Sequence, residues 1–240
     1  MCFQVQISRI ISESTIDYPG KFGPVFFSTG CNFACDYCYN YDLVEDARVM
    51  EKEEVDNFLR GISRKIKRGF YNGATISGGE PTLQLGIGDF SRRLKDMGLA
   101  VKLDTNGSNP DVLKYLKEQR LADYVAMDIK TCREKYFQFV GAEYLDFREL
   151  EKSIALVSQF PDYEFRTTCI ESEHDEDKIR KMGEWICGVL GEKPKRFCLQ
   201  AFVNTGKLRG RFKNEKDADK NYVERLARVM GDYAKEVVVR

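Results

Sequence analysis

Three cysteines, Cys31, Cys35 and Cys38, lie within one short stretch of the sequence, CNFACDYCYN. Their C-x₃-C-x₂-C spacing is too crowded for three independently buried thiols, so we interpret them as metal ligands. Structural zinc needs four ligands, and the other cysteines and the single histidine are scattered singly along the chain. A remote cysteine could complete a zinc site, and that alternative stays open.

A four-iron cluster also normally takes four thiolates. A protein that supplies only three leaves one iron with an open coordination site, which a substrate or cofactor can fill. An open iron suits inner-sphere electron transfer to a bound molecule, whereas a pure electron carrier gains nothing from exposing it. The three cysteines therefore favour an iron–sulfur site with chemistry at the open iron.

Polar residues also follow the next three apolar segments that are expected to be strands. These segments end in SGGEP (Ser77 to Pro81), DTNG (Asp104 to Gly107) and MDIK (Met127 to Lys130). In α/β barrels, active sites lie at the carboxyl ends of the strands. We therefore expect these residues to collect with the cysteines at one rim.

Short apolar segments alternate with amphipathic segments along the chain. Asn109 is expected to cap one helix, with Pro110 at its first position. The alternation, with short links, predicts parallel strands joined by crossover helices, as in an α/β barrel or a doubly wound sheet. Expected strands cover 23–30, 72–79, 99–105, 123–130, 163–170, 195–202 and 236–240, and expected helices cover 51–69, 82–98, 109–119, 146–160, 176–190 and 222–233.

Composition favours an ordinary globular protein with a buried core. Hydrophobic residues make up 42% of the chain, and 38 basic residues balance 38 acidic ones, so no overall positive field favours a nucleic acid or a membrane surface. No run of eighteen apolar residues and no secretory signal is present. Eight cysteines without an export signal indicate a reducing compartment, and we expect the protein to be cytoplasmic.

Several features have an ordinary structural interpretation. His174 lies in the acidic run ESEHDEDK and is expected to be solvated at the start of a helix. Residues 204–221 are expected to form a mobile surface loop, with a docking loop as the alternative. Three of the remaining cysteines are expected to be small buried side chains, whereas Cys132 follows the end of a strand and its role is left open; the three are Cys169, Cys187 and Cys198.

The cysteine motif with an aromatic residue before its last cysteine, followed one strand later by Gly-Gly-Glu-Pro, resembles the radical S-adenosylmethionine superfamily. The resemblance implies a partial (βα)₆ barrel in which the three cysteines bind a [4Fe–4S] cluster. It also implies that S-adenosylmethionine chelates the fourth iron through its amino and carboxylate groups. Reduction then splits the sulfonium into methionine and a 5′-deoxyadenosyl radical, which abstracts hydrogen.

The same resemblance implies roles for the rim residues. The glycines of SGGEP let the backbone approach a ligand, and Glu80 can accept from an ammonium. Asp104 is expected beside the cofactor and, with Asp128, to hold a monovalent cation; in the alternative, the two carboxylates are solvated or paired with Lys130. Arg166 is expected to contact the cofactor carboxylate, or to form an ordinary ion pair. The expected cofactor-binding residues are Tyr37 (near the adenine), Ser77, Gly78, Gly79, Glu80, Asp104, Thr105, Asn106, Asp128, Lys130 and Arg166.

Within the superfamily, the sequence is most similar to activating proteins of anaerobic ribonucleoside-triphosphate reductase, over roughly residues 10 to 205. These enzymes take a Cα hydrogen from one glycine of the partner reductase, and a flavodoxin or ferredoxin is expected as electron donor. Tyr39 stands where related activases often have histidine. We expect a single radical S-adenosylmethionine domain over residues 1–240, with a core at about 15–205 and a C-terminal extension at about 206–240.

Two other functions remain open at this stage. One is a radical enzyme for a small molecule, similar to the 7-carboxy-7-deazaguanine synthases, which are also short. The other is a non-catalytic module for metal binding or electron transfer. The sequence identifies neither the target glycine nor the oligomeric state.

Overall fold

The structure is a computed structural model that describes residues 5–45, 47–206, 208 and 210–240. Its strands are β1 (Ile7–Ser14), β2 (Gly23–Ser28), β3 (Gly73–Gly78), β4 (Ala100–Thr105), β5 (Tyr124–Asp128), β6 (Asp162–Cys169), β7 (Phe197–Ala201) and β8 (Val237–Val239). Its α-helices are α1 (Asp42–Glu45), α2 (Lys52–Lys67), α3 (Ile87–Asp96), α4 (Pro110–Glu118), α5 (Arg133–Val140), α6 (Phe147–Val157), α7 (Glu176–Leu190) and α8 (Lys220–Met230), with 3₁₀ turns at Pro81–Leu83 and Gly210–Phe212.

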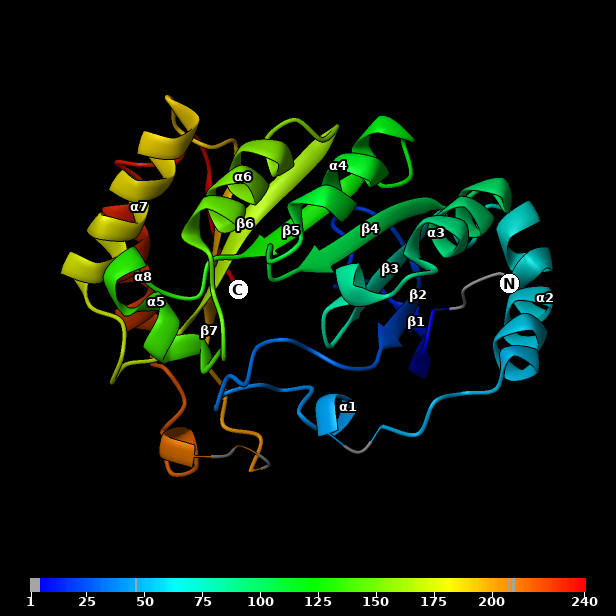
Figure 1. The fold of residues 1–240 in the computed structure, drawn as a ribbon, viewed down its shortest axis with the longest axis horizontal. Coiled ribbons are helices and arrows are strands. Elements are labelled where there is room, and N and C mark those ends of the chain that lie inside the picture. The colour runs from blue at the N-terminus through cyan, green and yellow to red at the C-terminus, as the bar shows by residue number, and fades with distance from the viewer. Residues whose placement is uncertain (1–4, 46, 207, 209) are drawn as a thin grey trace.

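The strands form one sheet in which each strand pairs with its neighbours in sequence, from β1 to β8. β1 runs antiparallel to β2, and every later pair is parallel. The crossover helices cover the outer side of the sheet, where α4 packs beside α6 and α7 beside α8 (Figure 1). The predicted partial barrel with parallel strands and outer helices is confirmed.

Local sequence explains where the helices begin. Asn109 accepts a hydrogen bond from the backbone N–H of Val112, and Pro110 occupies the first turn of α4, as predicted. Asp175 caps α7 in the same way through the N–H of Lys178. These caps satisfy backbone donors that a helix leaves without partners in its first turn.

One apolar stripe on each crossover helix faces the sheet. On α7 the predicted core residues Ile179, Met182 and Ile186 are fully buried. Each such side chain contributes roughly 1.5–3 kcal/mol by leaving water. Among the described residues, no helix combines the length and the apolar character needed to cross a membrane.

Three local features differ from expectation. The edge strand β1 was not predicted, because its sequence ISRIISES buries little besides Ile7. Helix α5 is only two turns long and was also missed. The helix expected over 82–98 is divided into a 3₁₀ turn at Pro81–Leu83 and helix α3, which begins only at Ile87.

The segment after β7, expected to form a surface loop, has two described residues that pack inward. Leu208 and Phe212 are buried, and the ring of Phe212 lies 5.9 Å from that of Tyr37, centroid to centroid. Figure 1 shows this orange segment beside the blue loop that follows β2. Lys207 and Arg209 lie outside the described residues. The burial of Leu208 and Phe212 was not predicted, because isolated apolar residues in a polar segment give no periodic signal.

Candidate active site

A cavity of about 340 Å³ opens where the parallel strands end. Its walls come from the loop after β2 and from the carboxyl ends of β3, β4, β5 and β6. Polar groups converge here because carboxyl ends of parallel strands meet at one edge. Every residue predicted for the site lines this cavity: Cys31, Cys35, Tyr37, Cys38, Ser77, Gly78, Gly79, Glu80, Asp104, Thr105, Asn106, Asp128, Lys130 and Arg166.

Backbone contacts hold the cysteine loop in place. The N–H of Ala34 donates to the carbonyl of Val140 at 2.9 Å, and the N–H of Cys38 donates to the carbonyl of Cys35 at 3.0 Å. All three motif cysteines line the cavity, and each residue is partly exposed. Burial raises the pKa of Cys31 to about 11 and that of Cys35 to about 12, so both thiols stay protonated until a metal binds them.

The glycines of SGGEP permit a close approach between β3 and the cysteine loop. A Cβ atom on Gly79 would lie 1.9 Å from the carbonyl oxygen of Gly30, which no side chain could tolerate. The N–H of Glu80 donates to that same oxygen at 2.7 Å. Gly78 adopts a positive φ of 123°, a conformation that glycine adopts without steric cost. The glycines of SGGEP therefore allow the end of β3 to lie directly against the loop that carries the cysteines.

Glu80 joins the ends of β3 and β4. One carboxylate oxygen accepts from the hydroxyls of Thr82 (2.6 Å) and Thr105 (2.7 Å), and the other accepts from the N–H of Asn106 (2.6 Å). The residue is only 1% exposed. Burial raises its pKa, although these donors oppose the increase. Glu80 therefore braces the ends of β3 and β4, and because Oε2 accepts only the Asn106 N–H here, its expected acceptance from an ammonium stays a prediction.

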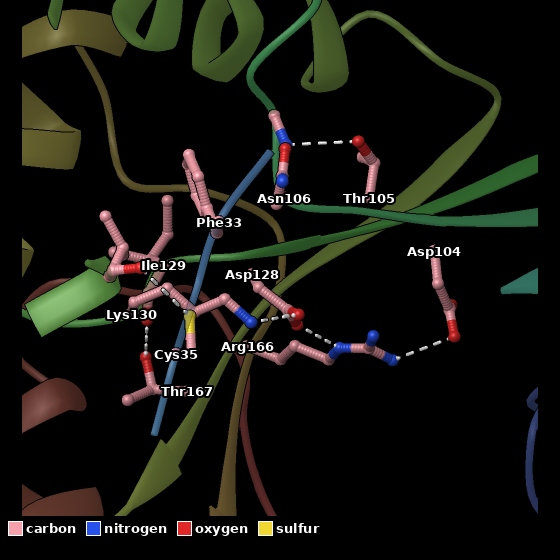
Figure 2. A network of polar contacts seen from close by, with 12 residues as sticks. Phe33, Cys35, Asp104, Thr105, Asn106, Asp128, Ile129, Lys130, Arg166 and Thr167 are labelled. Atoms are coloured by element: carbon pink, nitrogen blue, oxygen red, sulfur yellow. Dashed lines mark hydrogen bonds and ion pairs between the residues drawn. The ribbon is translucent and has the colours of Figure 1, made fainter. Parts of the chain in front are cut away.

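Asp104 and Asp128 face each other across Arg166 (Figure 2). The guanidinium of Arg166 contacts Asp128 through Nε and lies 3.4 Å from Asp104, while Lys130 Nζ contacts Asp128 at 2.7 Å. Lys102 makes a further ion pair with Asp104. Burial alone would raise the pKa of each carboxyl, but Arg166 and the lysines overcome it and hold both below the usual range. Asp128 is therefore paired with Lys130, as in the alternative, whereas Asp104 is paired with Lys102 and Arg166 instead.

Tyr37 lies in an aromatic cluster behind the cysteine loop. Its ring centroid is 5.0 Å from that of Phe139 and 5.9 Å from that of Phe212, and Lys130 Nζ lies 5.8 Å from the ring centre. Only 5% of the residue is exposed. These contacts give the ring a packing role, and its placement near an adenine stays a prediction.

Comparison with known proteins agrees with the cavity and the fold. Residues 25–177 match the family model of the radical SAM superfamily. The chain belongs to this superfamily. It is therefore an enzyme that uses a [4Fe–4S] cluster and S-adenosylmethionine.

Relatives and solved structures within the superfamily show how far the similarity extends. The chain is 32% identical, over 98% of its length and 95% of the relative's, to a protein of Methanocaldococcus jannaschii named as a glycyl-radical enzyme activating enzyme. It is 36% identical to the pyruvate formate-lyase-activating enzyme of Streptococcus mutans over 50% of the chain and 48% of that protein. Streptococcus suis SuiB bound to S-adenosylmethionine shares the fold with a TM-score of 0.66, at 16% identity, over 90% of this chain and 49% of that one.

The donor set of this radical SAM chain fits the cluster of the superfamily. Among the described residues, no group of three or more His, Cys, Asp or Glu side chains surrounds a position for one metal ion. Thiolates that share a cubane cluster bind different iron atoms, so they need not converge on one point. Three partly exposed cysteines at the rim of a polar cavity meet that requirement.

Two buried residues near the site were missed from the sequence. In AVKLDT the charged residues Lys102 and Asp104 alternate with apolar residues, so both lie on the same face of the strand. From this alternation a charged barrel interior could have been predicted. His174 was expected to be solvated, but it is 1% exposed. Its Nδ1 accepts from the N–H of Ile170 at 3.1 Å, and Nε2 lies 3.0 Å from the carbonyl oxygen of Lys130. The acidic neighbours point to solvent while the imidazole fills a polar gap between two loops.

The burial of His174 predicts an acid-sensitive contribution to stability. Burial lowers its pKa from 6.5 to about 4, so the unfolded chain binds this proton more tightly than the folded protein does. The contribution is fully present above the unfolded pKa and is lost as the pH falls toward the folded value. Relative to His174→Gln, the wild type should lose roughly 3 kcal/mol of unfolding free energy between neutral pH and about pH 4. Urea unfolding across this pH range measures the unfolding free energy of both proteins. The same pH dependence in the wild type and in His174→Gln would contradict the lowered pKa of His174.

Proposed function

We propose that this enzyme abstracts a Cα hydrogen from a glycine of a partner protein, and that the partner is an anaerobic ribonucleoside-triphosphate reductase. The observation that carries the proposal is the similarity to the Methanocaldococcus jannaschii protein, which extends over almost the full length of both chains. The resemblance of the cysteine region and of SGGEPTLQ, LDTNGSNP and DYVAMDIKT to reductase activases supports the choice of partner. The proposal extends to a single domain over residues 1–240 and to a flavodoxin or ferredoxin as the electron donor.

The residues have distinct roles in this proposal. Cys31, Cys35 and Cys38 are the three thiolate ligands of the cluster. When bound, the cluster and its cosubstrate supply a one-electron cleavage of the sulfonium and a carbon radical that abstracts hydrogen. The chain's own task is to orient the cosubstrate and to exclude water. The backbone of Ser77–Gly79 and the polar groups of Thr105 and Asn106 line the side of the cavity that faces the thiols.

Electrostatics of the inner cavity favour an anionic group on the ligand. Arg166 and Lys130 are the cationic side chains of the cavity lining, and both contact Asp128 at its inner end. An ammonium and a guanidinium at one end of a partly buried site attract a carboxylate, and the planar fork of arginine matches its geometry. This arrangement supports binding of the methionine carboxylate of S-adenosylmethionine beside Arg166 and Lys130.

Glu80 holds β3 and β4 together in this proposal, and its role is testable through stability. Glu80→Gln keeps one acceptor oxygen but replaces the other with an NH₂ group, so whichever donors face that group, the Asn106 N–H or the Thr82 and Thr105 groups, lose their acceptor. The unfolding free energy should fall by about 1–3 kcal/mol, because buried donors lose their acceptor. Urea denaturation of the cluster-free protein measures this loss. Glu143→Gln, at an exposed position, is the matched control and should leave stability unchanged; equal stability of both variants would argue against the brace.

The proposed reaction is tested in two stages. Protein reconstituted anaerobically with iron and sulfide is given S-adenosylmethionine and a strong reductant, and methionine and 5′-deoxyadenosine are measured. The same mixture with the purified reductase is then examined by electron paramagnetic resonance for a glycyl radical. Deuterium at the glycine Cα should appear in 5′-deoxyadenosine and should collapse the α-hydrogen splitting of the radical. Cleavage without a radical on the reductase would overturn the choice of partner.

A further inference from the structure

The ammonium of Lys102 is buried inside the barrel beside the cofactor cavity. Lys102 lies on β4, two residues before Asp104, and both side chains therefore point to the same side of the strand. The lysine side chain is 2% exposed and the aspartate side chain 9%. The ammonium forms an ion pair with Asp104 Oδ1, and it lies 5.8 Å from the centre of the Tyr124 ring.

The second oxygen of Asp104 also has partners from the chain. Oδ2 accepts a hydrogen bond from Ser77 Oγ at 2.9 Å and lies 3.4 Å from the Arg166 guanidinium. The facing carboxylate, Asp128, contacts Arg166 and Lys130. Both carboxylates are therefore neutralised by fixed side chains.

An added monovalent cation would be unfavourable in this arrangement. Both oxygens of Asp104 already have partners from the chain, so an added cation would lie beside the Lys102 ammonium and the Arg166 guanidinium and would lose its own hydration. The monovalent cation implied by resemblance to the activases therefore does not fit these residues. A lysine ammonium carries the same charge as a potassium ion, but it is covalently attached to β4 and does not have to bind from solution.

We propose that Lys102 is a built-in substitute for a monovalent cation at Asp104, and that this enzyme binds and cleaves S-adenosylmethionine without sodium or potassium. Lys102 acts as a positioning residue, because it holds the Asp104 carboxylate toward Ser77 and Arg166. This inference rests on the placement of S-adenosylmethionine beside Asp104 in the proposed function, but not on the identity of the protein partner.

The cation requirement of S-adenosylmethionine binding tests this inference. Binding to cluster-loaded protein is measured anaerobically in potassium, sodium and choline chloride at matched ionic strength, which keeps charge screening constant. The wild type should show less than about a twofold change in Kd among the three salts. A requirement of the wild type for potassium or sodium would overturn the proposal.

Removing the Lys102 ammonium should make the binding of S-adenosylmethionine depend on sodium or potassium. In Lys102→Met the charge is lost while the side chain remains long, and in Lys102→Ala there is also room for a small ion. In choline the Kd of each variant should increase about tenfold or more, and potassium or sodium should restore it in Lys102→Ala but not in Lys102→Met. Sodium NMR should show line broadening with Lys102→Ala but not with the wild type.

The control separates this effect from the general loss of a lysine. Lys65→Met removes a half-exposed lysine that pairs with Glu13 far from the cavity lining, and it should not respond to the salts. A folded Lys102→Ala variant that binds S-adenosylmethionine equally in all salts would contradict the proposal that Lys102 takes the place of a monovalent cation. Cleavage assays with the wild type report separately on the superfamily reaction, and radical formation on the reductase reports on the proposed function.

Discussion

Alanine in place of Cys31, Cys35 or Cys38 is expected to abolish cleavage of S-adenosylmethionine. Each thiol lines the cavity and would supply one of only three protein ligands, so no other cysteine of the motif can compensate. The loss should be at least about a thousandfold, or ~4 kcal/mol in the activation barrier. Iron and sulfide content after anaerobic reconstitution, together with the yield of 5′-deoxyadenosine, measures the effect.

Cys187 provides the matched control for these substitutions. Its thiol lies on α7 and donates to the carbonyl of Tyr233 at 3.3 Å, away from the cavity lining. Cys187→Ala should keep both the cluster and the cleavage activity. The fold of each motif variant should remain intact, because the three cysteines are partly exposed, and circular dichroism checks this. Similar losses in all four variants would contradict the assignment of the ligands.

The residues at the rim of the cavity could be predicted, because the end of each strand can be located in the sequence. Apolar segments marked the parallel strands, and the polar residues just after them had to meet at one edge. Cys31, Glu80, Asp104 and Asp128 were located in this way, far apart in sequence but on one cavity in the structure. This reasoning depends only on strand direction and needs no knowledge of side-chain packing.

Partners within the cavity could not be predicted in the same way. The donors around Glu80 come from two loops, and their convergence depends on the approach of Gly79 to Gly30. The burial of His174 depends on a gap between the loops after β5 and β6, although its sequence neighbours are charged. Such contacts are set by tertiary packing, for which local polarity is a poor guide.

The packing of the C-terminal segment on the cysteine loop is a further tertiary effect with a functional consequence. Phe212 and Leu208 belong to a separate apolar cluster with Tyr37 and Phe139. Gly210 approaches Asp36 so closely that a Cβ atom would lie 2.4 Å from its carboxyl carbon. These described residues therefore support the cysteine loop from outside.

Arg166→Lys is expected to weaken binding of S-adenosylmethionine by at least about tenfold, or ~1.4 kcal/mol, while the cluster is retained. The guanidinium of Arg166 reaches Asp104 and Asp128 together, whereas a lysine ammonium is a point charge that cannot bridge both with the same geometry. With lysine at position 166, either Asp104 or Asp128 would lose its contact with this side chain. Equilibrium binding to the reconstituted protein measures the loss, and iron content confirms that the cluster is present.

The same substitution should make the fold more sensitive to acid. In the wild type, Arg166 helps to hold the pKa of Asp104 and Asp128 below the ordinary value, so their stabilising contribution is present above about pH 4 and is lost only in stronger acid. Without the bridge these pKa values rise, and acid unfolding should begin at a higher pH. Arg196→Lys is the matched control, because Arg196 also has several partners, Asp162, Glu236 and Tyr124, but lies outside the cavity lining. If both variants bound S-adenosylmethionine as the wild type does, the bridge would have only a structural role, and the ligand carboxylate would have to be held by Lys130 alone.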